Sequence, residues 1–163
     1  MKISTLSKKE TAALIEIIRL TWPAELVPKI KTFKSFHLEQ GKFLLLADNF
    51  IAVQARDSVI LPFLGMDMIL NHFPSVHVDM GAVKFVCNGA KVMRPGITLL
   101  EFFKKNGIVV VRDQAHNKAL AVGIAMVDSE TATSMSTGYV IDNVHYISDK
   151  FWEASKTIQR SNA

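Results

Sequence analysis

Cysteine is almost absent from this chain of 163 residues, which contains only Cys87. A single cysteine excludes an intramolecular disulfide and a cysteine-rich zinc site, and it is typical of a protein kept in a reducing cytosol. The five histidines are scattered along the chain. His72 and His77 are five positions apart with a proline between them, which is not the i, i+4 spacing of a helical metal site. We therefore expect no metal and no cofactor.

Long hydrophobic runs are also missing. No segment approaches the ~18 consecutive apolar residues that a membrane-spanning helix needs. The apolar stretch near the N-terminus is interrupted by Glu16 and Arg19 and lacks a small-residue cleavage site, so it does not resemble a signal peptide. The expectation is a soluble, cytoplasmic protein without a membrane partner.

The glycine-rich loops that bind phosphates in many enzymes are missing as well. Residues 89–91 (GAK) lack the glycine five positions earlier and the Ser or Thr after the lysine that a P-loop requires. Cys87 has no histidine at a motif spacing to activate it, and helical spacing groups it with Val83 and Val86 as a small buried residue. We therefore predict that the protein is not an enzyme.

Positive charge is in mild excess, with 19 Lys and Arg against 15 Asp and Glu and a net charge of +4. The excess does not separate along the chain. Residues 1–73 carry nine basic and seven acidic side chains, and residues 74–163 carry ten and eight. Such a balance permits a polyanionic partner without requiring one.

The hydrophobic pattern changes near residue 74. Before it, Ser7 and Glu10 form a capping-box pattern ahead of apolar residues at helical spacing, which predicts a helix over 7–21. Alternating apolar residues and turn signals over 31–63 predict three or four antiparallel strands, and 65–73 is helical again.

After residue 74 the chain favours short strands with regular turns. The predicted strands are 76–78, 107–113, 118–127 and 138–147. We predict an α+β fold, with an N-terminal α+β domain over 1–74, a compact β-rich module over 75–155 and a C-terminal tail over 156–163.

The segment 78–97 combines three glycines with two lysines and an arginine. We predict a helix over 80–88 that Asp79 caps at its start and that Gly89 ends in a left-handed conformation. Residues 95–96 (PG) predict a type II turn after it.

This segment also carries a family resemblance. Residues 78–82 (VDMGA) and 89–97 (GAKVMRPGI) resemble the opening of a PUA domain, the RNA-binding pseudo-barrel named for pseudouridine synthases and archaeosine transglycosylases. The stretches 107–113 (GIVVVRD) and 119–125 (ALAVGIA) and then Gly138 follow in the order of that family. The resemblance implies a C-terminal PUA-type β pseudo-barrel that binds RNA.

The end of the chain narrows the resemblance. Residues 138–152 (GYVIDNVHYISDKFW) and 81–97 are similar to the malignant-T-cell-amplified-sequence and ligatin group of translation factors, and the chain resembles an archaeal-type member. This implies a non-enzymatic protein that binds ribosomal RNA of the small subunit or tRNA in translation initiation, reinitiation or ribosome recycling. It also implies an initiation-factor-like protein as a partner, although a chain with one cysteine cannot offer an N-terminal cysteine-based metal contact to it.

The resemblance implies an RNA-binding face at the end of the first PUA helix, on the strand after it and on the last strand. Lysine and arginine there would neutralise phosphates, and aromatic rings would stack on unpaired bases. Alternation over 138–147 places His145 and Tyr146 on opposite faces, so one of them belongs to the core, and we favour His145. The implied residues are Lys84, Asn88, Gly89, Ala90, Lys91, Arg94, His145 and Tyr146.

Two alternatives remain open. PUA modules often accompany catalytic domains, so the chain could be a targeting or accessory subunit of a tRNA- or rRNA-modifying enzyme. A second basic stretch contains Lys29, Lys31 and Lys34. It is typical of a solvated edge, but it could also touch ribosomal RNA.

Overall fold

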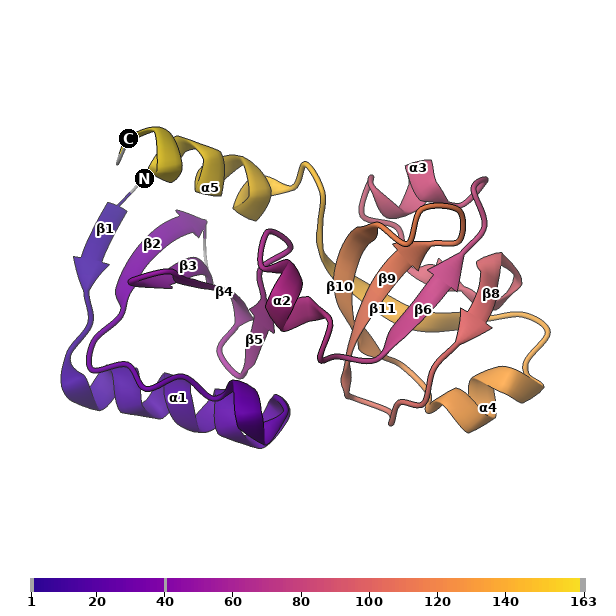
Figure 1. The fold of residues 1–163 in the computed structure, drawn as a ribbon, viewed down its shortest axis with the longest axis horizontal. Coiled ribbons are helices and arrows are strands. Elements are labelled where there is room, and N and C mark those ends of the chain that lie inside the picture. The colour runs from indigo at the N-terminus through magenta and orange to yellow at the C-terminus, as the bar shows by residue number, and fades with distance from the viewer. Residues whose placement is uncertain (1, 40, 162–163) are drawn as a thin grey trace.

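The structure, a computed structural model, describes residues 2–39 and 41–161 and contains two β-sheets that lie side by side (Figure 1). The elements of the first half are β1 (Lys2–Thr5), α1 (Lys8–Thr21), the 3-10 turn η1 (Ala24–Leu26), β2 (Lys34–Glu39), β3 (Lys42–Ala47), β4 (Phe50–Arg56), β5 (Val59–Pro62) and α2 (Asp67–Leu70). Those of the second half are β6 (Ser75–Val78), α3 (Val83–Val86), β7 (Val92–Met93), η2 (Arg94–Gly96), β8 (Ile97–Leu100), β9 (Ile108–Asp113), β10 (Ala119–Ala125), α4 (Ser129–Ser134), β11 (Tyr139–Tyr146) and α5 (Lys150–Ser161). No helix within the described ranges is long and apolar enough to cross a membrane.

The predicted first helix is confirmed as α1. The Ser7 hydroxyl accepts the Glu10 N–H at 3.0 Å, and the Glu10 carboxylate accepts the Ser7 N–H at 3.1 Å, which completes the capping box. Ile18 and Trp22 on its apolar side are buried, and the Trp22 indole donates to the carbonyl oxygen of Ile60 on β5 at 2.9 Å. This contact fixes α1 against the first sheet.

The first sheet is an antiparallel meander in the order β1-β2-β3-β4-β5. Its last four strands confirm the three or four strands that the sequence predicts over 31–63. The strand β1 was not predicted. It pairs with β2, with Ile3 opposite Phe36, and all four of its residues are exposed. Four exposed residues show no apolar alternation that would predict a strand. Their pairing with β2 is not visible locally either, because β2 lies beyond the first helix in the sequence.

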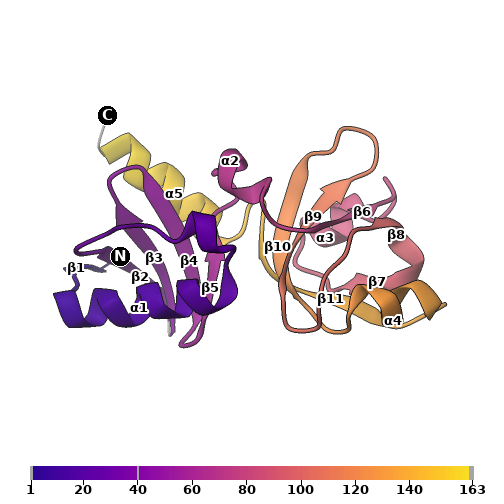
Figure 2. The ribbon, with the colours of Figure 1, turned by 60° about the horizontal axis from the view of Figure 1, so that its bottom comes forward.

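The helix α5 returns to the first sheet after the second one is complete (Figures 1 and 2). It packs on β2 and β3, on the face opposite α1, and buries Phe151 and Ile158 in the core of the first domain. The boundary predicted after residue 155 falls inside α5. The segment predicted as a C-terminal tail therefore continues this helix to residue 161, and residues 162–163 lie outside the described residues.

The second sheet has the order β7-β11-β10-β9-β6-β8 and curls into a nearly closed pseudo-barrel, with α3 and α4 at its two ends (Figure 1). The strand β6 runs parallel to β9, and the other pairs are antiparallel. The hairpin of β9 and β10 confirms the predicted pair of strands. The architecture therefore confirms an α+β fold with a C-terminal β pseudo-barrel.

Two local predictions in the segment 78–97 differ from the structure. The helix is shorter than predicted, because α3 begins at Val83. Asp79 closes the turn before the helix, where its carboxylate accepts the Ala82 N–H at 2.9 Å. The predicted type II turn at Pro95 and Gly96 is wrong. A type II turn would require a positive φ at Gly96, whereas these residues form the 3-10 turn η2, which the Ile97 N–H closes on Arg94.

The two sheets share buried contacts. Ile108, Val110 and Val122 of the second sheet belong to the same buried cluster as Phe63 of the first half. An ion pair at 3.1 Å between Arg56 on β4 and Asp142 on β11 adds a link at the surface. The contact region between the two sheets, here called the domain junction, is therefore packed, and it fixes the position of β11.

Candidate nucleic-acid interface

The end of α3 forms the centre of the candidate interface. The Gly89 N–H donates to Val86 at 3.0 Å and the Ala90 N–H donates to Phe85 at 3.0 Å, which together make a Schellman motif. Gly89 has φ +90, so the predicted left-handed helix end is confirmed. A Cβ at this position would lie 2.9 Å from the Tyr146 ring, so only glycine allows β11 to approach so closely.

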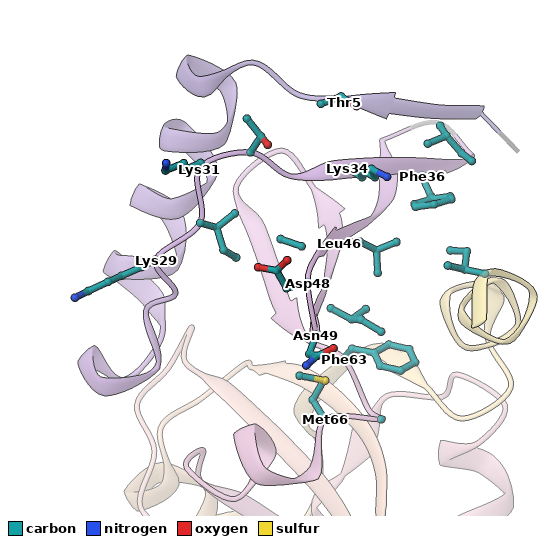
Figure 3. A pocket seen from close by; sticks show the side chains of 17 residues that line it. Thr5, Lys29, Lys31, Lys34, Phe36, Leu46, Asp48, Asn49, Phe63 and Met66 are labelled. Atoms are coloured by element: carbon teal, nitrogen blue, oxygen red, sulfur yellow. The ribbon is translucent and has the colours of Figure 1, made fainter. Parts of the chain in front are cut away.

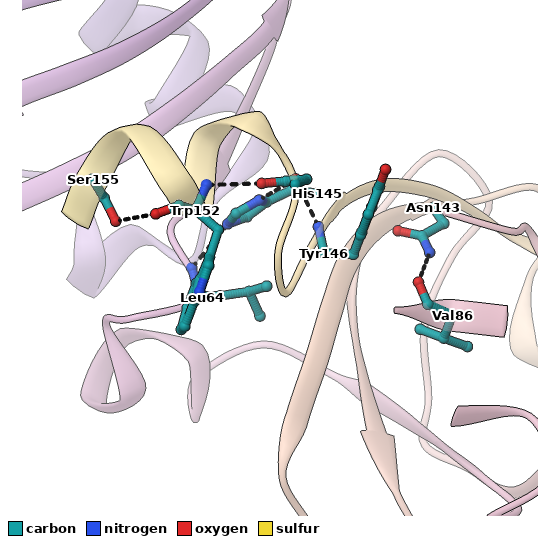
Figure 4. Close-up of polar contacts among 8 residues, drawn as sticks. Leu64, Val86, Asn143, His145, Tyr146, Trp152 and Ser155 are labelled. Carbon is teal, nitrogen blue, oxygen red and sulfur yellow. Dashed lines mark hydrogen bonds and ion pairs between the residues drawn. The ribbon is translucent and has the colours of Figure 1, made fainter. Parts of the chain in front are cut away.

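The Asn143 side chain on β11 also hydrogen-bonds to the backbone at the end of α3 (Figure 4). Its side-chain amide donates to the carbonyl oxygen of Val86 at 2.9 Å and to that of Ala90 at 3.1 Å. The Val86 carbonyl, which already accepts the Gly89 N–H, thereby gains a second donor, and the Ala90 carbonyl just past the helix end receives one. The backbone at the end of α3 is thereby rigid, although Asn88 and Ala90 are exposed.

Two exposed lysines stand beside exposed aromatic rings on this surface. The Lys84 ammonium lies 5.2 Å from the centroid of the Phe85 ring, and the Lys91 ammonium lies 5.4 Å from that of Tyr139. The rings are 57% and 51% exposed, which leaves them accessible to a ligand. Neither lysine forms an ion pair with any residue that the structure describes.

Phe85 and Tyr139 were missed by the sequence analysis. For Phe85 a signal was present, because a helix that turns Val83 and Val86 inward places the two residues between them, Lys84 and Phe85, on its outer side. For Tyr139 the sequence contains no comparable signal. Its position beside Lys91 depends on the pairing of β11 with β7, in which Tyr139 lies opposite Met93.

Arg94 has a structural role that the sequence did not predict. Its guanidinium donates to the carbonyl oxygen of Ala132 at 2.7 Å and to that of Ile97 at 3.1 Å, and the residue is half-buried. It thus holds α4 against η2. Two of its five donors are engaged in the fold, so its contact with RNA stays a prediction for the remaining donors.

His145 does not belong to this surface, and its predicted contact with RNA is corrected here (Figure 4). The side chain is 0% exposed and stacks on Phe63 at a centroid distance of 5.4 Å. Nε2 accepts the Leu64 N–H at 3.1 Å, and Nδ1 lies 2.8 Å from the Asp149 carboxylate. A backbone N–H can only donate, so Nε2 is unprotonated and Nδ1 carries the proton that is donated to Asp149. The alternation along β11 decides this, because it turns His145 toward the domain junction.

Asp149 completes the junction. Its carboxylate also accepts the N–H groups of Tyr146 and Trp152, each at 2.8 Å, and so it caps the start of α5. Tyr146 itself is half-buried against Gly89 on the other side of the strand. The structure therefore brings Lys84, Asn88, Gly89, Ala90, Lys91 and Tyr146 together, with Arg94 anchored nearby and His145 behind them.

Comparison with known proteins agrees with this geometry. The family model described as the PUA domain matches residues 74–147. Translation machinery-associated protein 20 of Saccharomyces cerevisiae is 30% identical over 139 residues, which cover 80% of this chain and 77% of that protein. The chain belongs to the translation machinery-associated protein 20 family. Malignant T-cell-amplified sequence 2 of Homo sapiens is 29% identical over 140 residues, which cover 80% of this chain and 76% of that protein, so the predicted resemblance is confirmed.

Archaeal relatives share most of the chain. An uncharacterized protein of Methanocaldococcus jannaschii is 36% identical over 132 residues, which cover 78% of this chain and 80% of that protein. The crystal structure of a hypothetical protein from Pyrococcus horikoshii superimposes with a TM-score of 0.78 at 26% identity. The superposition covers 94% of this chain and 99% of that one, so both domains of the fold are shared.

Proposed function

We propose that this PUA-domain protein is a non-enzymatic RNA-binding protein of the translation apparatus, and that it acts on the small ribosomal subunit or on tRNA during initiation, reinitiation or recycling. The observation that carries the proposal is the pair of exposed lysine–aromatic contacts at Lys84–Phe85 and Lys91–Tyr139. A cation neutralises a phosphate and an exposed ring stacks on a base, and the two together suit an unpaired RNA segment.

The rigid backbone between these contacts supports the same function. The Gly89 turn is held by Asn143 and by the Tyr146 ring, so the surface is formed before RNA binds and little ordering free energy is lost on binding. The family name of the yeast relative associates that protein with the translation machinery, which favours ribosomal RNA or tRNA as the ligand. An initiation-factor-like protein is the partner that we expect alongside the RNA.

The test is the binding of the purified protein to small ribosomal subunits and to tRNA across a salt series. With Lys84→Glu and Lys91→Glu combined, affinity should fall at least tenfold, and the salt dependence should become shallower by about 0.7 in log–log slope for each lost phosphate contact. The matched control is Lys104→Glu with Lys105→Glu, two exposed lysines in the same domain outside this surface. Equal losses in both double variants would refute the assigned surface.

Co-purification distinguishes the proposed role from the alternative. Association of the tagged protein with small ribosomal subunits is expected under the present proposal. Association with a tRNA- or rRNA-modifying enzyme, in the absence of ribosomal subunits, would instead support the accessory-subunit role.

A further inference from the structure

The first domain contains a groove that the proposed RNA surface does not use (Figure 3). The groove has a volume of about 1000 Å³ and follows one row across the sheet, in which Thr5, Lys34, Leu46 and Ile51 are consecutive cross-strand neighbours. Leu46 and Ile51 are only half-buried, whereas Phe36 in the next row is 7% exposed. The helix α5 therefore covers part of this face and leaves the row of Leu46 and Ile51 accessible.

The floor of the groove is apolar and its rim is basic. Apolar side chains reach the groove from β1, β2, β3, β4, the loop before α2, and α5, and they include Ile3, Phe36, Leu46, Ile51, Met66 and Ile158. Lys29, Lys31 and Lys34 stand along the rim, all exposed, and Asp48 is the acidic residue among the lining residues that the structure describes.

The three rim lysines form no ion pair with any residue in the described ranges. In contrast, Lys42 and Lys150 in the same region both pair with Glu39. The rim therefore presents uncompensated positive charge beside an accessible apolar surface, which is complementary to an acidic segment with apolar side chains.

The chemistry of the floor favours a protein segment over RNA. The aromatic rings in the lining, Phe36 and Phe63, are 7% and 3% exposed, so they present no free face on which a base could stack. The accessible part of the floor is aliphatic, so apolar side chains of a bound protein segment would be stabilised by burial against it. On the pseudo-barrel, by comparison, Phe85 and Tyr139 expose more than half of their surface beside lysines.

We propose that this groove binds an acidic amphipathic segment of a partner protein, whose apolar side chains cover Leu46 and Ile51 and whose carboxylates face Lys29, Lys31 and Lys34. The proposal does not depend on the RNA surface, because the two share no residue. A protein and an RNA can therefore occupy the chain at the same time.

The test uses synthetic probes and the full chain. Two fluorescein-labelled peptides of about 15 residues contain only glutamate and leucine, one with leucine at the i, i+3, i+4, i+7 spacing of a helix and one in the strict alternation of a strand. The comparison probes are the same peptides with lysine in place of every glutamate, and a single-stranded RNA of about 12 nucleotides. We expect at least one acidic peptide to bind, with an affinity that falls as salt rises, and the lysine peptides not to bind.

Variants locate the binding. Lys29→Glu, Lys31→Glu and Lys34→Glu combined should weaken the acidic peptide at least tenfold, and Ile3→Gln, a neutral change at a residue 58% exposed, should weaken it a few-fold. The matched control combines Lys2→Glu, Lys8→Glu and Lys9→Glu. It makes the same change of charge in the same domain at exposed residues outside the groove, and it should leave binding unchanged.

The proposal is overturned if neither acidic peptide binds, if the lysine peptides bind equally well, or if both triple variants weaken the peptide alike. It is also overturned if the groove variant loses the RNA and keeps the peptide, which would assign Lys29, Lys31 and Lys34 to RNA. Loss of RNA binding in the Lys84 and Lys91 variant, with peptide binding intact, would support both assignments separately.

Discussion

The neighbouring residues His145 and Tyr146 lie on opposite faces of β11 and have different environments. His145 is fully buried, and both of its ring nitrogens have partners in the domain junction. Tyr146, the next residue, faces the end of α3, where the lysines and aromatic rings of the candidate interface remain exposed. One strand therefore supports a closed polar network on one side and an open binding surface on the other.

The difference shows that the residue type alone does not identify a ligand site. A histidine at the end of the last strand has the chemistry to stack on a base, but its hydrogen-bonding groups are already used by the protein. Lys84 and Lys91 lie beside aromatic rings but form no ion pair with the described residues, and so their charges are available to RNA.

The largest effect is expected on the closed side. His145→Ala leaves the buried Leu64 N–H without its acceptor, removes one of the donors to the Asp149 carboxylate and opens a cavity, so it should lower the free energy of unfolding by about 3 kcal/mol. Urea denaturation measures this loss. His116→Ala, at an exposed histidine in the same domain, is the control and should cost less than about 0.5 kcal/mol. A folded His145→Ala protein should bind RNA normally, and a marked loss of RNA affinity at full folding would contradict the buried role.

An intermediate effect is expected on the open side. Tyr139→Ala should weaken RNA binding by about 1–3 kcal/mol through the loss of one stacked base, and it should leave the salt dependence unchanged, because no charge is removed. Fluorescence titrations at several salt concentrations measure both quantities. Phe102→Ala removes an aromatic ring that is 77% exposed and lies outside this surface, so it should bind RNA like the unmodified protein. A similar loss in both variants would contradict a specific stacking role for Tyr139.

The smallest effect concerns an exposed contact at the start of α5, beside the buried His145–Asp149 pair. Glu39 on β2 accepts from Lys150 and, at 2.8 Å, from Lys42, and these bonds lower the pKa of the Glu39 carboxyl from 4.5 to about 2. A lowered pKa stabilises the folded protein above pH 4.5, and that contribution is lost as the pH falls from 4.5 toward 2. Thermal unfolding across this range should show a slightly weaker acid dependence in Glu39→Gln than in the unmodified protein. Because the pair is exposed, the difference should shrink in high salt, and a difference that salt does not change would contradict this origin.

Local patterns predicted much of the fold. The capping box at Ser7, the four-strand meander, the hairpin of β9 and β10 and the left-handed Gly89 each depend on residues close together in the sequence. The same holds for the opposite faces of His145 and Tyr146. These features follow from backbone preferences and from the periods of helices and strands, which operate over a few residues.

Contacts between distant segments decided the rest. The strand β1 exists through its pairing with β2, and the residues predicted as a tail form the end of α5 because Phe151 and Ile158 are buried on the first sheet. Arg94 donates to the carbonyl oxygen of Ala132 on α4. This contact could not be predicted from a local pattern, because the two residues are far apart in the sequence.

The sequence by itself determined the first helix, the meander, the family and the basic character of the segment around Gly89. Only the tertiary structure decided which of these groups are free. It paired Lys91 with the Tyr139 ring, enclosed His145 behind the same strand, and left the row of Leu46 and Ile51 uncovered beside three lysines. The physical reason is that burial and hydrogen-bond satisfaction depend on which segments pack together, and one sequence window does not contain that information.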